Sequence, residues 1–322
     1  MGTFLAIVLF GLGLFLIIQG GDVLVRAALR LNEKTGINQV IIGATFVSVA
    51  TTLPEVFVSM FAVAAGNHGI AVGNAIGSMI ANIALVFAIS LIFFPSGVRR
   101  GEIFFKALFL FAITAVVFLF GVNLQFSWYE GVILLSVFIG FLLFNIYESK
   151  KEKVAIPPIA EEKSGVAWGK IAFGFVLGQT MLCIGAFALV ENGEILAHIF
   201  GISETVIGFT VIAVGTSLPE LVTAVSSIRR KSGGLAVGNV IGANIINCTL
   251  LLGVCGIIGD IRGSGLPVSR ETAFIALPVL FLMTVVAVLP ILIKGRAYKG
   301  QGAVLLALYV AYIAYLFIVQ PL

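Results

Sequence analysis

The chain has 322 residues, of which 60% are hydrophobic and only 11% are charged, and its formal net charge is +4. Soluble domains carry roughly 25% charged residues, so this composition excludes a soluble globular protein and indicates an integral membrane protein. No basic patch interleaved with aromatic residues accompanies the positive charge, so we expect no nucleic-acid partner. The three cysteines have spacings that match no metal or disulfide pattern, and we expect them to be buried as small apolar residues.

Apolar stretches of about 20 residues, the length that crosses a bilayer, recur along the chain. We predict ten transmembrane helices, at residues 3–20, 38–63, 70–94, 103–121, 128–147, 169–190, 204–228, 235–258, 271–293 and 302–319. The first stretch has no cleavage site after a short apolar core, so it is expected to be a helix and not a signal peptide. The predicted fold class is therefore an all-α integral membrane protein.

The basic residues indicate how these helices are oriented. Apart from Arg262 and Arg270, all of the 19 Lys and Arg residues lie near the ends of odd-numbered spans or in the segment that follows the fifth span. Cytoplasmic loops of membrane proteins carry an excess of Lys and Arg. We therefore expect a multi-pass protein of the cell membrane with both termini outside. Asp22 and Arg26, one turn apart after the first span, are expected to form an interfacial ion pair.

The ten helices divide into two halves of five, at residues 1–147 and 168–322. Because five is an odd number, the second half must enter the membrane from the opposite side. This is the inverted-topology repeat of many secondary transporters. Residues 148–167 lie between the halves, are charged and contain Pro-Pro, so we expect a solvated cytoplasmic linker there.

One segment occurs twice in the chain. Residues 43–55 are GATFVSVATTLPE and residues 208–220 are GFTVIAVGTSLPE, an offset of 165 that also relates GNAIGSMIAN (73–82) to GNVIGANIIN (238–247). Each copy places a Pro-Glu pair inside an apolar stretch. A charged residue at the centre of a membrane helix costs about 2.5–3.5 kcal/mol to insert. Two matched carboxylates, Glu55 and Glu220, therefore predict a cation site.

The residues around each glutamate supply further oxygen atoms. Pro54 and Pro219 deprive the carbonyls of Ala50 and Gly215 of their helical partners, and in hydrocarbon such carbonyls need protein, water or an ion. Hydroxyl side chains precede the glutamates on the same helix face, although Ser and Thr in membrane helices also commonly bond back to carbonyls. Amides follow each glutamate by 27 residues. The hydroxyls are Ser48, Thr51, Thr52, Thr216 and Ser217, the amides are Asn82 and Asn247, and Ser78 lies four residues before Asn82.

An all-oxygen ligand set favours a hard cation, and calcium takes 6–8 such ligands. The glycines of each Gly-Asn-x-x-Gly motif lie four residues apart, which permits close approach between helices. The sequence therefore predicts a transported divalent cation, bound near the contact between the two halves.

These motifs resemble the cation/calcium exchanger superfamily, in its short prokaryotic sodium/calcium exchanger branch. The signature of that family is close to G-x-T-x-x-A-x-G-T-S-x-P-E followed by G-N-x-x-G-S-N, and residues 208–220 match it fully. The resemblance implies an antiporter and not an enzyme, exchanging Ca²⁺ for Na⁺ by alternating access as the first and sixth helices slide. Its implied partners are the lipid bilayer and inorganic cations, with no cofactor and no obligate protein partner.

The resemblance also implies a ligand set. Calcium is expected between Glu55 and Glu220, with the backbone carbonyls of Thr51 and Thr216. Flanking sodium sites are expected to use the two glutamates, the carbonyls of Ser48 and Ala213, and the hydroxyls of Thr52, Ser217 and Ser78.

The chain departs from the family pattern in several places. Position 247 is Asn where many sodium/calcium exchangers carry Asp, position 243 is Ala where Ser is expected, and Met79 replaces an Asn. In the first copy, Ser48, Ala50 and Thr52 stand where Ala, Gly and Ser are usual. Two glutamates carry a charge that one calcium ion neutralises, whereas three sodium ions would leave one positive charge.

The charge balance leaves a three-to-one or a two-to-one cycle open, as well as protons or another divalent cation in place of the expected ions. A cation channel is disfavoured by the inverted repeat. An intramembrane hydrolase would need a nucleophile with its base or a histidine metal site, and the two histidines are expected in loops.

Overall fold

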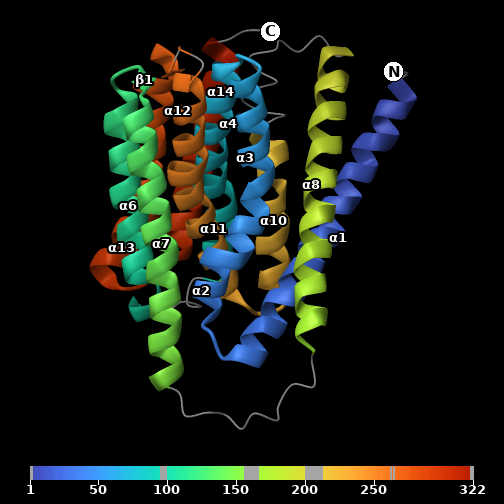
Figure 1. The fold of residues 1–322 in the computed structure, drawn as a ribbon, viewed down its shortest axis with the longest axis vertical. Helices are drawn as coiled ribbons and strands as arrows, with labels where there is room; N and C mark the ends of the chain where they lie inside the picture. Colours follow the sequence, from blue (N-terminus) through green and yellow to red (C-terminus); the bar gives the residue numbers. More distant parts are fainter. Residues whose placement is uncertain are drawn as a thin grey trace.

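The computed structural model describes residues 3–94, 100–155, 167–199, 213–261, 263 and 265–319. These residues are almost entirely helical (Figure 1). The described helices, with η marking a π-helical turn, are α1 (Thr3–Thr35), α2 (Gln39–Ile42), η1 (Gly43–Val47), α3 (Ser48–Ala64), α4 (His68–Ala81), η2 (Asn82–Phe87), α5 (Ala88–Phe93), α6 (Arg100–Gly121), α7 (Trp128–Ala155), α8 (Trp168–Ile199), α10 (Ala213–Arg229), α11 (Gly233–Ile246), η4 (Asn247–Leu251), α12 (Leu252–Ile261), η5 (Thr272–Ala276), α13 (Leu277–Lys294) and α14 (Lys299–Val319). The short strands β1 (Gln125–Phe126) and β2 (Leu266–Pro267) pair antiparallel, with Phe126 opposite Leu266.

Within the described part of the chain, nine helical stretches are long and apolar enough to cross a membrane. They coincide with nine of the ten predicted spans, so the all-α membrane fold is confirmed. The seventh span, predicted at 204–228, is described only from Ala213, where α10 begins, and its first residues lie outside the described part.

Several helices extend beyond the apolar stretches that predicted them. α1 continues to Thr35, α8 to Ile199 and α7 to Ala155, and α7 thereby enters the stretch expected to be a linker. Residues 156–166 of that stretch lie outside the described residues. Hydropathy marks only the part of a helix that lies in hydrocarbon, whereas backbone hydrogen bonding continues through charged residues in the headgroup region. The histidines were expected in loops, which is wrong: His68 begins α4, and His198 lies in the last turn of α8.

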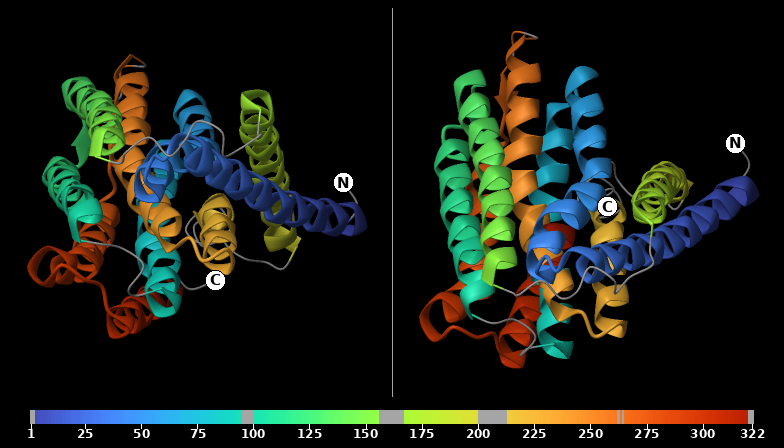
Figure 2. Two further views of the ribbon diagram at one scale, coloured as in Figure 1. Left: turned by 90° about the horizontal axis from the view of Figure 1, so that it is seen from below. Right: turned by 60° about the horizontal axis from the view of Figure 1, so that its bottom comes forward.

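α1 and α8 form a pair at one side of the molecule, packed along each other beside the remaining helices (Figures 1 and 2). Their contact is nearly backbone to backbone: a Cβ added at Gly13 would lie 2.8 Å from the Gly185 carbonyl oxygen, and one at Gly20 would lie 3.0 Å from that of Gly178. The four glycines are related by the same offset of 165, since 13 matches 178 and 20 matches 185. The two helices therefore contribute glycines from matching positions of the repeat to their mutual contact.

α11 lies at the centre of the fold, and all of its residues are buried. It packs against α2, η1, α3 and α10, which come from both halves. At Gly242 an added Cβ would lie 2.6 Å from the Ser48 hydroxyl oxygen and 2.7 Å from the Ala44 Cα. The close helix approach predicted from the glycine motif is confirmed for this copy, and it brings the two repeated segments into contact.

Two of the π-helical turns occupy matched positions in the halves. η2 begins at Asn82 and η4 begins at Asn247, the two amides that the sequence places after the glutamates. A π-helical turn inserts one extra residue into a helix, and such turns are frequent at functional sites. Both amides thus lie where the regular helical register changes.

Candidate cation site

The two repeated glutamates are the centre of the site. Glu55 lies in the middle of α3 and Glu220 in the middle of α10, each directly after the proline of its helix. Both side chains are 0% exposed, and their charges repel each other. An unneutralised pair of carboxylates in such surroundings is strongly unfavourable. The arrangement therefore calls for positive charge between the two helices.

Several polar side-chain atoms at the glutamates and near them have no hydrogen-bond partner in the protein. Within the described part of the chain, buried side-chain atoms of the site that accept or donate no hydrogen bond are both carboxylate oxygens of Glu55, Oε2 of Glu220, Oγ of Ser217, and both amide atoms of Asn82 and of Asn247. Leaving a buried polar group unpaired costs about 1–3 kcal/mol, and more for a charged group. A cation would satisfy the oxygens of this cluster, whereas the amide nitrogens are donors and need an acceptor such as a water that the cation retains.

Contacts across the two halves bring the predicted ligands together. The Thr52 hydroxyl of α3 donates to Oε1 of Glu220 in α10, with 3.3 Å between the oxygens. The Ser78 hydroxyl of α4 lies 3.2 Å from the Thr216 hydroxyl of α10. Residues from α3, α4 and α10 therefore surround one volume, as the symmetry of the repeats requires.

The other predicted ligands lie on the same elements. Ser48 and Thr51 are fully buried in α3. The Ser48 hydroxyl bonds back to the Thr45 carbonyl at 3.2 Å, and the Thr51 hydroxyl shares its hydrogen between the Ser48 carbonyl at 3.4 Å and Oδ1 of Asn239 at 3.2 Å. This is the back-bonding expected for hydroxyls in membrane helices. Ala213 is the first residue of α10, and its side chain lies outside the described part.

The remaining departures from the family pattern are also buried. Met79 is 0% exposed, and its sulfur accepts a hydrogen bond from the Cys248 thiol with 3.2 Å between the sulfurs, so a weak thiol–thioether bond stands where the family pattern has an amide. Ala243 is likewise 0% exposed.

No group of three or more His, Cys, Asp or Glu side chains that could hold a metal occurs among the residues that the structure describes. The site thus combines two carboxylates with neutral oxygens, the donor set of hard cations.

Two further amides, which the sequence reasoning missed, join the halves. Oδ1 of Asn74 accepts a hydrogen bond from the Thr216 hydroxyl at 2.9 Å, and Oδ1 of Asn239 accepts one from the Thr51 hydroxyl at 3.2 Å. Both residues belong to the repeated Gly-Asn-x-x-Gly motif, in which only the glycines are predicted to matter. The duplication of the asparagine at the offset of 165 was the available signal.

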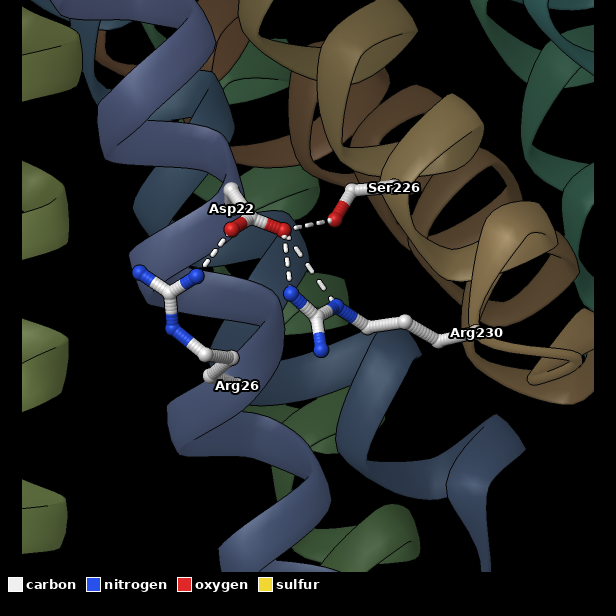
Figure 3. Close-up of polar contacts among 4 residues, drawn as sticks. All are labelled: Asp22, Arg26, Ser226 and Arg230. Carbon is white, nitrogen blue, oxygen red and sulfur yellow. Dashed lines mark hydrogen bonds and ion pairs between the residues drawn. The ribbon is translucent and has the colours of Figure 1, made fainter.

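A second polar cluster lies where α1 meets α10 (Figure 3). The predicted ion pair between Asp22 and Arg26 is confirmed. The Asp22 carboxylate also accepts hydrogen bonds from the Ser226 hydroxyl at 2.7 Å and from Nη2 of Arg230 at 2.6 Å. The side chains of Asp22 and Arg230 are about one-third exposed, at 33% and 34%. This cluster joins the α1–α8 pair to the helix that carries Glu220.

A bundle of membrane helices with a repeated, kinked, carboxylate-bearing segment from each half is the architecture of a secondary transporter. The chain belongs to the sodium/calcium exchanger family: the family described as sodium/calcium exchanger protein matches residues 5–147 and 170–318.

Individual relatives cover nearly the whole chain. The sodium/calcium exchanger MaX1 of Methanosarcina acetivorans is 29% identical, over 95% of this chain and 97% of its own length. A membrane protein of Methanocaldococcus jannaschii is 33% identical, over 95% of this chain and 96% of its own length. The solved structure of the sodium-calcium exchanger NCX_Mj soaked with 100 mM Na⁺ and 10 mM Sr²⁺ is 31% identical and superimposes with a TM-score of 0.83, covering 97% of this chain and 99% of that one.

Proposed function

We propose that this protein is a secondary active antiporter that exchanges Ca²⁺ for Na⁺ by alternating access. The observation that carries the proposal is the matched pair Glu55 and Glu220, both 0% exposed, with three of their four carboxylate oxygens lacking a protein partner. Family membership and the sodium/calcium exchangers among its relatives support the choice of ions.

Calcium would bind between the two glutamates, with the backbone carbonyls of Thr51 and Thr216 completing its ligand set. Sodium would use the same carboxylates together with the hydroxyls of Thr52, Ser217 and Ser78, and the carbonyls of Ser48 and Ala213. Because Asn247 is neutral, the pair of glutamates supplies the whole negative charge of this ligand set. Sharing those two carboxylates makes the binding of one ion exclude the other, which is what couples the two fluxes.

Alternating access would follow from movement of the α1–α8 pair against the other helices. Both glutamates are sealed from solvent, so an ion cannot reach them unless helices move. α1 and α8 lie beside the helices that carry the glutamates, and their mutual contact is backbone to backbone. The pair can therefore move as a unit. The basic residues would place both termini outside the cell and the segment between the halves in the cytoplasm.

The test is calcium uptake into proteoliposomes that contain the full chain. With sodium inside and voltage clamped by potassium and valinomycin, we expect an outward sodium gradient to drive uptake. Glu55→Gln and Glu220→Gln should abolish uptake, because each removes a charge that calcium needs. Glu130→Gln is the matched control, since Glu130 is also buried but caps the start of α7, accepting a hydrogen bond from the Ser127 amide.

The other outcomes are equally informative. Uptake driven by a pH gradient and not by sodium would overturn sodium coupling. Full uptake by Glu55→Gln would overturn the assignment of the site.

A further inference from the structure

The two cross-half asparagines lie at the edge of the ligand set but are not part of it. Asn74 of α4 and Asn239 of α11 are each 1% exposed, and each accepts a hydrogen bond from a threonine of the opposite half. Thr216 and Thr51 immediately precede Ser217 and Thr52, whose hydroxyls belong to the proposed sodium ligands. The asparagines thus contact the ligand set through hydroxyl groups.

The orientation of each amide is set by its nitrogen. Nδ2 of Asn74 donates to the Ser59 hydroxyl at 2.9 Å and to the Glu55 carbonyl at 3.3 Å. Nδ2 of Asn239 donates at 2.8 Å to the Thr223 hydroxyl, which itself donates to the Pro219 carbonyl. In both halves the nitrogen is held by the helix that carries the glutamate. The oxygen of each amide must therefore face the other half.

Around Asn74 this places two hydroxyl groups at one amide oxygen. The Thr216 hydroxyl donates to Oδ1 of Asn74 at 2.9 Å. The Ser78 hydroxyl lies 3.2 Å from the Thr216 hydroxyl and 3.5 Å from the same Oδ1, to which it donates. A hydroxyl has one hydrogen and two lone pairs. With its hydrogen directed at Asn74 or Thr216, Ser78 is left with lone pairs that a cation can use.

We infer that Asn74 is a positioning residue for sodium: its oxygen and the Thr216 hydroxyl hold the hydrogen of Ser78, which is thereby directed away from the ion. The inference rests on the proposed function. Asn239 makes the matching bond to Thr51, but the residue matching Ser78 is Ala243, which has no hydroxyl to orient. The arrangement of asparagine, threonine and serine is therefore complete around Asn74 and lacks the serine around Asn239. Sodium binding consequently depends on Asn74 more than on Asn239.

The test is equilibrium binding of Na⁺ and Ca²⁺ to the purified full chain, measured by calorimetry. Groups that orient metal ligands typically contribute 10–100-fold in affinity, so Asn74→Ala should weaken sodium binding by about tenfold or more. Calcium binding should change less than about threefold, because its proposed ligands are carboxylates and carbonyls. Asn239→Ala should weaken sodium binding less than Asn74→Ala does. Asn244→Ala is the matched control, since this buried amide donates to the Val240 carbonyl of its own helix.

A double-mutant cycle separates positioning from packing. If Asn74 acts through Ser78, Asn74→Ala should weaken sodium binding no further once Ser78→Ala is present. Thr216→Val, which keeps side-chain shape and backbone carbonyl, should reproduce the sodium defect even if Asn74→Ala folds poorly. Equal losses for both ions, or additive losses in the cycle, would overturn the positioning role. If the unsubstituted protein bound neither ion, the proposed function itself would fail.

Discussion

The Asp22 carboxylate in α1 and the Arg230 guanidinium in α10 are 208 residues apart in sequence and bond at 2.6 Å (Figure 3). Next to them, an added Cβ at Gly21 would lie 2.7 Å from Cγ1 of Val222 in α10, so the two helices are in close contact here. The residue that matches Asp22 in the second half is Phe187. The bond is therefore present at one end of the α1–α8 pair and has no counterpart at the other.

Weakening this bond should change transport more than binding. Exposed ion pairs contribute about 0.2–1 kcal/mol, so Asp22→Asn and Arg230→Gln should each change the exchange rate only a few-fold, with calcium affinity unaltered. The effects should be non-additive in the double variant, because both remove the same bond. Arg229→Gln, at the neighbouring exposed position of α10, is the control for loss of charge. Additive effects, or an equal effect of Arg229→Gln, would contradict a role for the bond.

The α1–α8 contact should tolerate no side chain at Gly13. Gly13→Ala would place a methyl group 2.8 Å from the Gly185 carbonyl oxygen, and overpacking of this kind costs about 1–3 kcal/mol. We expect a lower melting temperature in detergent. Gly11→Ala is a matched control in the same helix, since nothing lies within 4 Å of its added Cβ. It should be neutral or slightly stabilising, because Ala favours helix over Gly. Equal behaviour of the two variants would refute the close contact.

An acidic residue introduced at position 247 should tighten cation binding. Asn247 is 0% exposed and both of its amide atoms lack protein partners, so Asn247→Asp adds a carboxylate without breaking an existing bond. A nearby opposite charge favours a bound cation, and we expect about tenfold tighter sodium binding. Asn247→Ala, which removes the amide without adding charge, should weaken it. Titrations by calorimetry measure both, and tighter binding by the Ala variant would remove Asn247 from the ligand set.

The ion pair between the buried Lys106 of α6 and the partly buried Glu148 of α7 should be needed for stability. Lys106 is 1% exposed, so Glu148→Gln leaves a buried positive charge without its partner, a change that typically costs about 3–5 kcal/mol. Replacing both residues, as Lys106→Met with Glu148→Leu, should recover most of the melting temperature lost by Glu148→Gln. Glu102→Gln, at the half-buried acidic residue in the first turn of α6, is the control, and an equal loss in this variant would show that net charge is responsible.

The cation site was predicted only in part from the sequence. Glu55 and Glu220 were found because duplication at a fixed offset marks residues related by symmetry even when their partners are unknown. The structure brings Thr52 to Glu220 and Ser78 to Thr216, and their role as ion ligands stays a prediction. Asn74 and Asn239 were missed, because an asparagine beside a packing glycine has no local signature of the hydroxyl it will meet. Glu148 was assigned to the linker because it is charged, whereas α7 carries it into an ion pair with the buried Lys106.

What the sequence alone determined was the set of membrane helices, their division into two related halves and the two carboxylates. These follow from local properties: about 20 apolar residues suffice to cross a bilayer, and a buried charge is too costly to occur twice without a purpose. Only the tertiary structure decided which atoms meet across the halves: Thr216 with Asn74, Thr51 with Asn239, and Asp22 with Arg230. Those contacts join residues 142 to 208 positions apart, and they depend on how the helices pack, which no single segment encodes.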